Sequence, residues 1–252
     1  MKVYFKTFGC RTNIYDTELL KSYVKNYEIV NDDNIADIIV VNSCTVTNGA
    51  DSGVRNYINS MRNSGKKVIL TGCGAVSKGD ELFKSSAIFG VLGASNKSKI
   101  DEMLGKSEPF YELGDLNFID KNIVSNYENH TKAFIKIQEG CDFACSYCII
   151  PSVRGFSRSI DEDIILKEAK ILASNGYSEI VLTGTNIGSY GKGVGTSLGR
   201  LVAHLGKING IKRIRLGSIE PSQIDESFRE ILHEPWLERH LHIALQHTSQ
   251  QM

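Results

Sequence analysis

The sequence predicts an α/β protein in which a doubly wound parallel-sheet domain is followed by an incomplete (β/α) barrel. In roughly the first 100 residues, short apolar runs alternate with amphipathic stretches, which is the pattern of parallel β/α units. A second series of strands follows, spaced at about the 30 residues that one βαβ unit needs. We therefore predict a first domain at 1–104, a linker at 105–131 and a second domain at 132–252.

The first domain is expected to contain strands separated by helices. The strands are predicted at 2–7, 37–42, 67–71 and, from a weaker pattern, 87–91. The helices are predicted at 14–27, 50–63 and 97–104. Asp16 and Glu18 would then lie in the first turn of the first helix, where the helix dipole favours negative charge.

The linker is polar and has no sustained period, so at most one short strand is expected in it. After it, strands are predicted at 133–138, 179–183, 212–216 and 240–245, and helices at 161–174, 198–208 and 223–233. Right-handed parallel units of this kind curl into a barrel. Four strands cannot close one, and the last strand would present an unpaired apolar edge. We therefore expect the chain to be the N-terminal portion of a longer protein, or to need a partner over that edge.

The composition is that of an ordinary globular protein and leads us to expect a cytoplasmic location. Hydrophobic residues make up 41% of the chain. No run approaches the roughly 18 apolar residues of a membrane helix, and the N-terminus has no signal-peptide layout. Lys and Arg together number 29, as do Asp and Glu, so nucleic-acid binding would depend on local patches and not on overall charge.

Three of the six cysteines lie in one short run, Cys141-Asp-Phe-Ala-Cys145-Ser-Tyr-Cys148. Disulfides are not expected in a reducing compartment. Three thiolates are one fewer than the four that usually saturate a cubane iron–sulfur cluster, so one iron would be free to bind a small molecule. Structural metal sites are normally closed, and an open position therefore indicates chemistry.

The other three cysteines share a placement, because each lies just past a predicted strand. Cys10, Cys44 and Cys73 are separated by 34 and 29 residues. The carboxyl ends of parallel strands form the edge at which open α/β sheets bind ligands, so we expect the three thiols to meet there. Two alternatives stay open: three unrelated buried thiols, or a zinc site, which would want a fourth ligand from Cys or His.

Several motifs resemble a known family. The Cys-x3-Cys-x2-Cys run, with Tyr147 before its last cysteine, resembles the signature of radical S-adenosylmethionine enzymes. The stretches Phe8-Gly-Cys10-Arg-Thr-Asn13, Asn42-Ser-Cys44-Thr-Val-Thr47 and Thr71-Gly-Cys73 resemble the N-terminal domain of the methylthiotransferases. Pro151-Ser-Val-Arg154-Gly-Phe-Ser-Arg158-Ser is similar to that family's stretch after the cluster loop. Leu182-Thr-Gly-Thr-Asn186-Ile-Gly-Ser-Tyr-Gly191 is similar to the MtaB-type subgroup, which acts on N6-threonylcarbamoyladenosine in tRNA.

The resemblance, which covers nearly the whole chain, implies an enzyme with two [4Fe-4S] clusters and S-adenosyl-L-methionine. The cluster on Cys141, Cys145 and Cys148 would bind S-adenosylmethionine at its open iron, and the cluster on Cys10, Cys44 and Cys73 would deliver sulfur. The implied reaction is a radical-based insertion of a methylthio group at C2 of N6-threonylcarbamoyladenosine beside the anticodon. The implied partners are tRNA, an electron donor and a sulfur source, with no membrane. The cofactors carry the chemistry, so no side chain is assigned a catalytic role.

Five further residues are candidates for binding. Tyr147, Asn186 and Glu220 are expected to face the cofactor, and Glu220 falls at the end of the third barrel strand, where barrel active sites form. Arg154 and Arg158 are expected to bind the substrate, because a guanidinium holds phosphate or carboxylate with two bonds. A solvated loop is the alternative for both arginines.

Other functions fit parts of the pattern. A methylthiotransferase could act on another adenine modification or on a ribosomal-protein aspartate. A non-catalytic metal-binding or RNA-binding fragment is an alternative of another class. The oligomeric state does not follow from the sequence.

Overall fold

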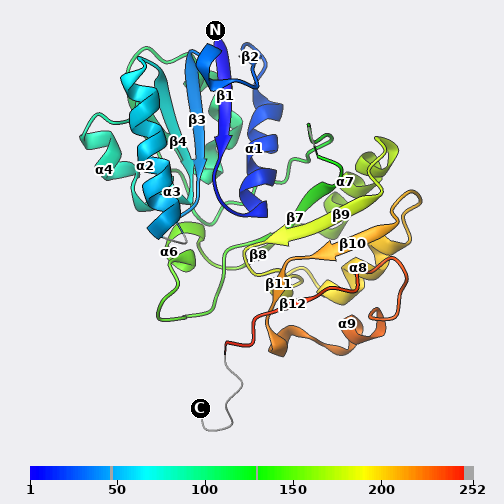
Figure 1. Cartoon of the computed structure of the whole chain (residues 1–252). Helices are drawn as coiled ribbons and strands as arrows, with labels where there is room; N and C mark the ends of the chain where they lie inside the picture. The colour runs from blue at the N-terminus through cyan, green and yellow to red at the C-terminus, as the bar shows by residue number, and fades with distance from the viewer. Residues whose placement is uncertain (46–47, 129, 247–252) are drawn as a thin grey trace. The chain divides into compact units, whose positions relative to one another are not determined.

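The computed structural model describes residues 1–45, 48–128 and 130–246, and the chain forms two compact units (Figure 1). The first unit contains Met1–Asn122 together with Phe143–Gly155, and the second contains Ile123–Asp142 together with Phe156–Met252. Each unit is therefore made of two separate chain segments. The predicted boundaries at 104 and 132 would instead divide the chain into consecutive domains. Within the described residues, no helix has both the length and the apolar character needed to span a bilayer.

The first unit is built on a six-stranded sheet with the order β2-β1-β3-β4-β5-β6, in which every pair is parallel. The strands are β1 (Lys2–Thr7), β2 (Glu28–Ile29), β3 (Ile38–Ser43), β4 (Lys67–Gly72), β5 (Gly90–Leu92) and β6 (Phe110–Glu112). The predictions at 2–7, 37–42 and 67–71 are confirmed to within one residue. The edge strands β2 and β6 are only two and three residues long, too short to produce a periodic pattern.

Helices cover both faces of this sheet (Figure 1). One face packs against α1 (Arg11–Tyr23) and α5 (Ile100–Leu104), through residues such as Leu20 and Met103. The other face packs against α2 (Asn48–Asn63), α3 (Cys73–Ser77) and α4 (Gly79–Lys84). The central strand β3 is buried at all six positions, as a strand covered on both faces must be. The doubly wound first domain is thus confirmed.

The first helix begins three residues earlier than predicted. It starts at Arg11, directly after Cys10, and no acidic residue lies in its first turn. Asp16 is therefore not at the helix dipole, and its buried carboxylate is paired instead with Lys97 and Arg154. The predicted helix at 97–104 is divided into the 3-10 helix η2 (Ala94–Lys99) and α5.

The second unit contains a sheet with the order β10-β9-β7-β8. Its strands are β7 (Ala133–Glu139), β8 (Arg158–Ser159), β9 (Glu179–Gly184) and β10 (Arg213–Leu216). The strands β7, β9 and β10 are mutually parallel, and only the short β8 is antiparallel. The helices α7 (Glu162–Ser174) and α8 (Leu198–Gly206) contribute buried leucines and isoleucines, so this unit has the β/α alternation of a partial barrel.

The end of the second unit differs from the prediction. The last strand is only β12 (His242–Ile243), and it pairs with β11 (Ser218–Ile219) and not with β10. Beside β10 the chain makes one isolated parallel bridge, between Ile214 and Leu237. The predicted helix at 223–233 is shorter as well, because it is divided into the 3-10 helix η4 (Pro221–Gln223) and α9 (Glu226–Glu230).

Candidate functional site

Three cysteines follow three neighbouring strands at the carboxyl edge of the first unit's sheet. Cys10 lies between β1 and α1, Cys44 follows β3, and Cys73 begins α3 directly after β4. The strand order reverses between β1 and β3, and in open α/β sheets this switch point is where ligands bind. The topology therefore brings the ends of the three strands, and with them the three cysteines, to one edge.

Two glycines allow the chain segments at this edge to approach closely. Gly9 has a φ of +107°, and a Cβ atom there would lie 2.2 Å from Cys44 Cβ. Gly72 has a φ of +79°, and a Cβ atom there would lie 2.3 Å from Asn42 Oδ1. Any side chain at either position would both strain the backbone and separate the strand ends.

The thiols differ in exposure and influence one another. Cys44 is 6% exposed and Cys73 is 3% exposed, whereas Cys10 is exposed. Burial raises the pKa of the Cys73 thiol, the Arg154 guanidinium opposes that rise, and the nearby Cys44 and Cys10 thiols add to it.

The chemistry of these donors fits an iron–sulfur cluster. Thiolates are soft ligands, which select iron–sulfur clusters, zinc or cuprous copper over hard cations. Asn42 Oδ1 and Thr45 Oγ1 are buried without hydrogen-bond partners, so polar atoms remain to be satisfied at the same edge. In the described part of the chain, no three or more His, Cys, Asp or Glu side chains are grouped closely enough to hold a single metal ion. The rest of the second motif, Val46 and Thr47, lies outside the described residues.

The second group of cysteines lies in a more open loop. Cys145 is exposed, and Cys141 and Cys148 are partly buried. The Cys148 N–H donates to the Cys145 carbonyl, which forms a turn between these two. Next to Cys141, Asp142 accepts hydrogen bonds from Lys192 Nζ and the Ser157 N–H, and both bonds hold the pKa of its carboxyl below the usual value.

Of the predicted cofactor-binding residues, Asn186 lies beside a cysteine. It follows β9, is 8% exposed, and its Nδ2 lies 3.7 Å from Cys141 Sγ. Its backbone N–H donates to Gln138 Oε1, which fixes the turn after the strand. Glu220 is the N-cap residue just before η4, and its N–H donates to Gln223 Oε1. Tyr147 is 75% exposed.

The structure places Arg154 differently from the prediction. It is 4% exposed, and its guanidinium donates to Cys73 Sγ, Asp16 Oδ2 and Asn13 Oδ1. These are protein groups inside the first unit, so Arg154 is not presented to a nucleic acid. Arg158 lies in β8, where its Nη1 donates to the Phe156 carbonyl.

Sequence reasoning missed three residues of this site. Asn13, Asp16 and Lys97 are 0%, 2% and 2% exposed, and all belong to the network around Arg154. Asn13 and Asp16 are three residues apart, so they occupy one face of α1. The spacing of Asn13 and Asp16 just after Cys10 could have predicted that both belong to the site. No sequence feature predicts this for Lys97, because only the fold brings it to Asp16.

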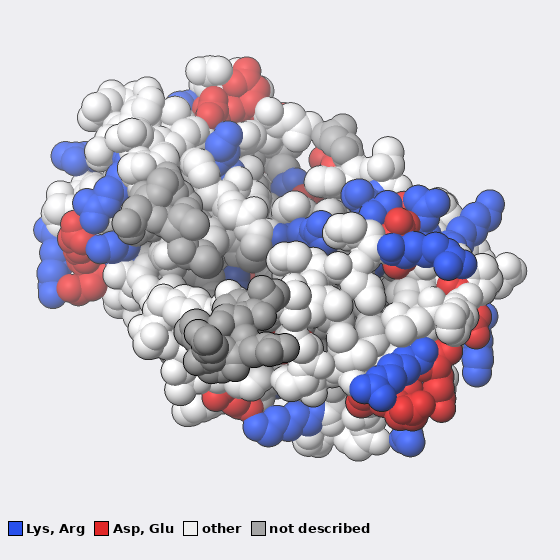
Figure 2. All heavy atoms as spheres, turned by 60° about the horizontal axis from the view of Figure 1, so that its bottom comes forward, with Lys and Arg blue, Asp and Glu red and all other residues white. Residues whose placement is uncertain are grey.

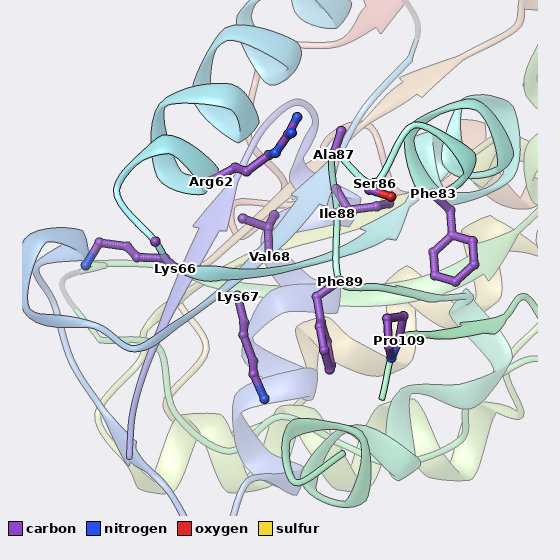
Figure 3. A pocket seen from close by; sticks show the side chains of 11 residues that line it. Arg62, Lys66, Lys67, Val68, Phe83, Ser86, Ala87, Ile88, Phe89 and Pro109 are labelled. Carbon is purple, nitrogen blue, oxygen red and sulfur yellow. The ribbon is translucent and has the colours of Figure 1, made fainter. Parts of the chain in front are cut away.

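A cavity of about 400 Å³ lies at the opposite, amino edge of the same sheet (Figure 3). It is lined by cations and aromatic rings, and Lys66 and Lys67 point in different directions there. Lys66 Nζ donates to the carbonyls of Asn34 and Ala36, and Lys67 Nζ donates to the Lys106 carbonyl and lies over the Phe89 ring. These amines serve the protein's own carbonyls, and the cavity is separate from the cysteines.

Comparison with protein families assigns most of the chain to two regions. Residues 2–93 match the uncharacterized protein family UPF0004. Residues 135–251 match the radical SAM superfamily. The first match contains Cys10, Cys44 and Cys73, and the second contains Cys141, Cys145 and Cys148.

The chain is similar to curated proteins along almost its whole length. A Helicobacter pylori protein, whose name assigns it provisionally as a methylthiotransferase, is 52% identical over 98% of this chain and 60% of its own length. The threonylcarbamoyladenosine tRNA methylthiotransferase MtaB of Aquifex aeolicus is 38% identical over 99% of this chain and 64% of its own length. The tRNA-2-methylthio-N(6)-dimethylallyladenosine synthase of Fervidobacterium nodosum is 31% identical over 99% and 60%. The chain thus spans about 60% of the length of the curated relatives it matches.

Among solved structures, the chain resembles the radical S-adenosylmethionine methyltransferase TsrM of Kitasatospora setae. The match has a TM-score of 0.66 and 14% identity, and it covers 99% of this chain and 62% of that one. At this identity the likeness shows a shared fold and nothing more.

Proposed function

We propose that the chain is part of a tRNA methylthiotransferase. It belongs to the radical SAM superfamily and carries a UPF0004 region ahead of its radical SAM region. The observation that carries the proposal is the placement of the cysteines. Cys10, Cys44 and Cys73 follow three neighbouring strands at the carboxyl edge of the first unit's sheet, and the other three cysteines have the radical SAM spacing.

The residues would serve this activity in different ways. Cys141, Cys145 and Cys148 would hold one [4Fe-4S] cluster, and Cys10, Cys44 and Cys73 would hold a second. When bound, the first cluster would supply an open iron for S-adenosylmethionine and the electron that cleaves it. The second cluster would supply the place from which sulfur is delivered. Asn186, at 3.7 Å from Cys141 Sγ, would donate to that sulfur and orient it. Because Cys44 and Cys73 are buried, they would keep water from the cluster that they hold together with Cys10.

The proposed substrate is tRNA carrying N6-threonylcarbamoyladenosine, methylthiolated at C2. The stretch from Leu182 to Gly191 supports this choice, as does the 38% identity to a relative named for that nucleoside. The relative named for dimethylallyladenosine supports a second candidate, which is the same reaction on another modified adenine. On the face in Figure 2, basic and acidic side chains lie in mixed groups, so binding of tRNA would depend on local clusters of Lys and Arg.

Nucleoside analysis of tRNA tests this proposal. Deletion of the gene should abolish 2-methylthio-N6-threonylcarbamoyladenosine and leave the unmethylthiolated nucleoside in its place. Reintroducing the gene should restore the product, and a Cys73→Ala copy should not. Loss of the dimethylallyl product alone would favour the second candidate. An unchanged nucleoside profile in a strain without a second methylthiotransferase would contradict both.

A further inference from the structure

Arg154 connects the two cysteine-bearing segments of the first unit. It is the last residue of α6 (Ile150–Arg154) and lies six residues after Cys148 in the segment Phe143–Gly155. Its Nε–H donates to Cys73 Sγ at 3.1 Å, although the two residues are 81 positions apart in sequence. A side chain from the cluster loop's own continuation therefore reaches a sulfur of the other group.

Two residues of α1 hold the guanidinium in this orientation. Arg154 Nη1 lies 2.9 Å from Asp16 Oδ2, and Nη2 lies 2.6 Å from Asn13 Oδ1. Both partners are buried, so the bonds are shielded from water. Because a guanidinium is planar and rigid, fixing both Nη atoms also fixes the direction of the Nε–H bond. That direction is toward Cys73.

The network brings positive charge to the sulfurs. The second oxygen of Asp16 lies 3.3 Å from Lys97 Nζ, so one carboxylate is in contact with two cations. Arg154 and Lys97 thus share one carboxylate, and Arg154 brings its own cation directly against Cys73 Sγ. A cubane core held by three thiolates is negative, and it becomes more so on reduction. Buried charges are tolerated when they are paired, so the network and a bound cluster complement each other.

We propose that Arg154 is a positioning residue for the cluster on Cys10, Cys44 and Cys73, which donates to a ligating sulfur and raises the reduction potential of that cluster. The inference rests on the proposed three-cysteine cluster. Its physical reason is that a hydrogen bond to sulfur and a nearby positive charge both stabilise the reduced state more than the oxidised state. A purely structural arginine would affect stability and leave the potential unchanged.

The test isolates the second cluster. With Cys141, Cys145 and Cys148 all changed to Ala in the whole chain, only the cluster on the other three cysteines remains to be measured. The potential and the electron paramagnetic resonance spectrum of the reconstituted protein are then recorded for three variants: Arg154→Met, Arg154→Lys and the control Arg62→Met. Arg62 is an exposed residue in the last turn of α2.

We expect Arg154→Met to lower the equilibrium constant for reduction of the cluster by tenfold or more. For a one-electron couple this is a fall of about 59 mV in the reduction potential. Arg154→Lys retains the charge, but a single ammonium cannot reach all three partners in the same geometry. It should therefore lower the potential by less and still alter the spectrum. Arg62→Met should match the parent. If the Arg154 variants bind iron and have the same potential and spectrum as the control, the proposed role of Arg154 is wrong, while the proposed cluster stands.

Two further outcomes keep the test decisive. If Arg154→Met does not fold or retain iron, Arg154→Lys decides, and a potential and spectrum equal to the control's would overturn the role. If the parent with the three alanines binds no iron, the proposed second cluster is wrong, and the role of Arg154 is wrong with it. Failure of the cluster and failure of the inference are thus told apart by the iron content of the parent.

Discussion

Glycine at position 72 decides how closely the end of β4 can approach the end of β3. Its φ of +79° and ψ of −159° belong to a region that is open to glycine almost alone. An added Cβ would also lie 2.5 Å from the Ser43 carbonyl oxygen, which is backbone and cannot turn away. The position of Cys73 next to Cys44 therefore depends on a residue with no side chain.

Gly72→Ala should destabilise the first unit by more than about 3 kcal/mol, from backbone strain and overpacking together. Gly65→Ala is the matched control, because Gly65 has a similar φ of +76° and nothing within 4 Å of an added Cβ. Backbone strain alone should cost it about 1 kcal/mol. Urea unfolding followed by circular dichroism measures both. Equal losses in the two variants would show that crowding at Ser43 does not matter.

At the scale of elements, long patterns were predictable and short ones were not. The strand at 2–7 was predicted at its observed limits, and the helix at 161–174 to within one residue, because each has enough residues to show a period. The helices α3 and α4 were not predicted, because their five and six residues are too few to show a helical period. The start of α1 was misplaced because Cys10 precedes it without any side-chain cap to mark the first turn.

The starts of β9 and β10 are joined by charges, and this gives a pH dependence. Glu179 is in contact with Arg215, Arg213 and Lys132. Burial raises the pKa of the Glu179 carboxyl, but the hydrogen bond and positive charge of Arg215 outweigh that, with help from the other two, and hold the pKa below its usual value. A carboxyl with a lowered folded-state pKa stabilises the fold above its unfolded pKa, and this contribution is lost as the pH falls through the folded value.

Glu179→Gln should therefore lower the free energy of unfolding at pH 7 by about 0.5–1 kcal/mol, since the pairs are partly exposed. The difference from the parent should shrink as the pH falls below the unfolded pKa of about 4.3. Urea unfolding across that range checks the effect. Glu234→Gln, at an exposed position of the same unit, serves as the control. A difference that persisted at low pH would mean that packing, and not charge, is responsible.

At the scale of the whole molecule, the two compact units do not follow the order of the chain. The segment Phe143–Gly155, with Cys145 and Cys148, clusters with the first unit, although both neighbouring segments belong to the second. Sequence periodicity assigns neighbours in sequence to one domain, and it contains no signal for such an exchange. The buried bonds of Arg154 to α1 are one physical cause of it.

The two groups of cysteines predict a definite metal content for the whole chain. Anaerobic reconstitution should give about eight iron and eight sulfide ions per chain, in two cubane clusters. Changing Cys10, Cys44 and Cys73 together to Ala should leave about four of each, and so should changing the other three. Iron and labile-sulfide assays measure both numbers, and each triple variant controls for the other. Bound zinc without iron would contradict the assignment of both groups.

The sequence by itself determined the two α/β regions, the cysteine spacing in the loop and the placement of Cys10, Cys44 and Cys73 after strands. These are local properties, since periodicity and spacing are written in neighbouring residues. Only the tertiary structure decided that Arg154 lies inside the first unit with Asp16, Asn13 and Cys73. The physical reason is that a buried guanidinium needs partners to offset its desolvation, and those partners come from segments far away in the sequence.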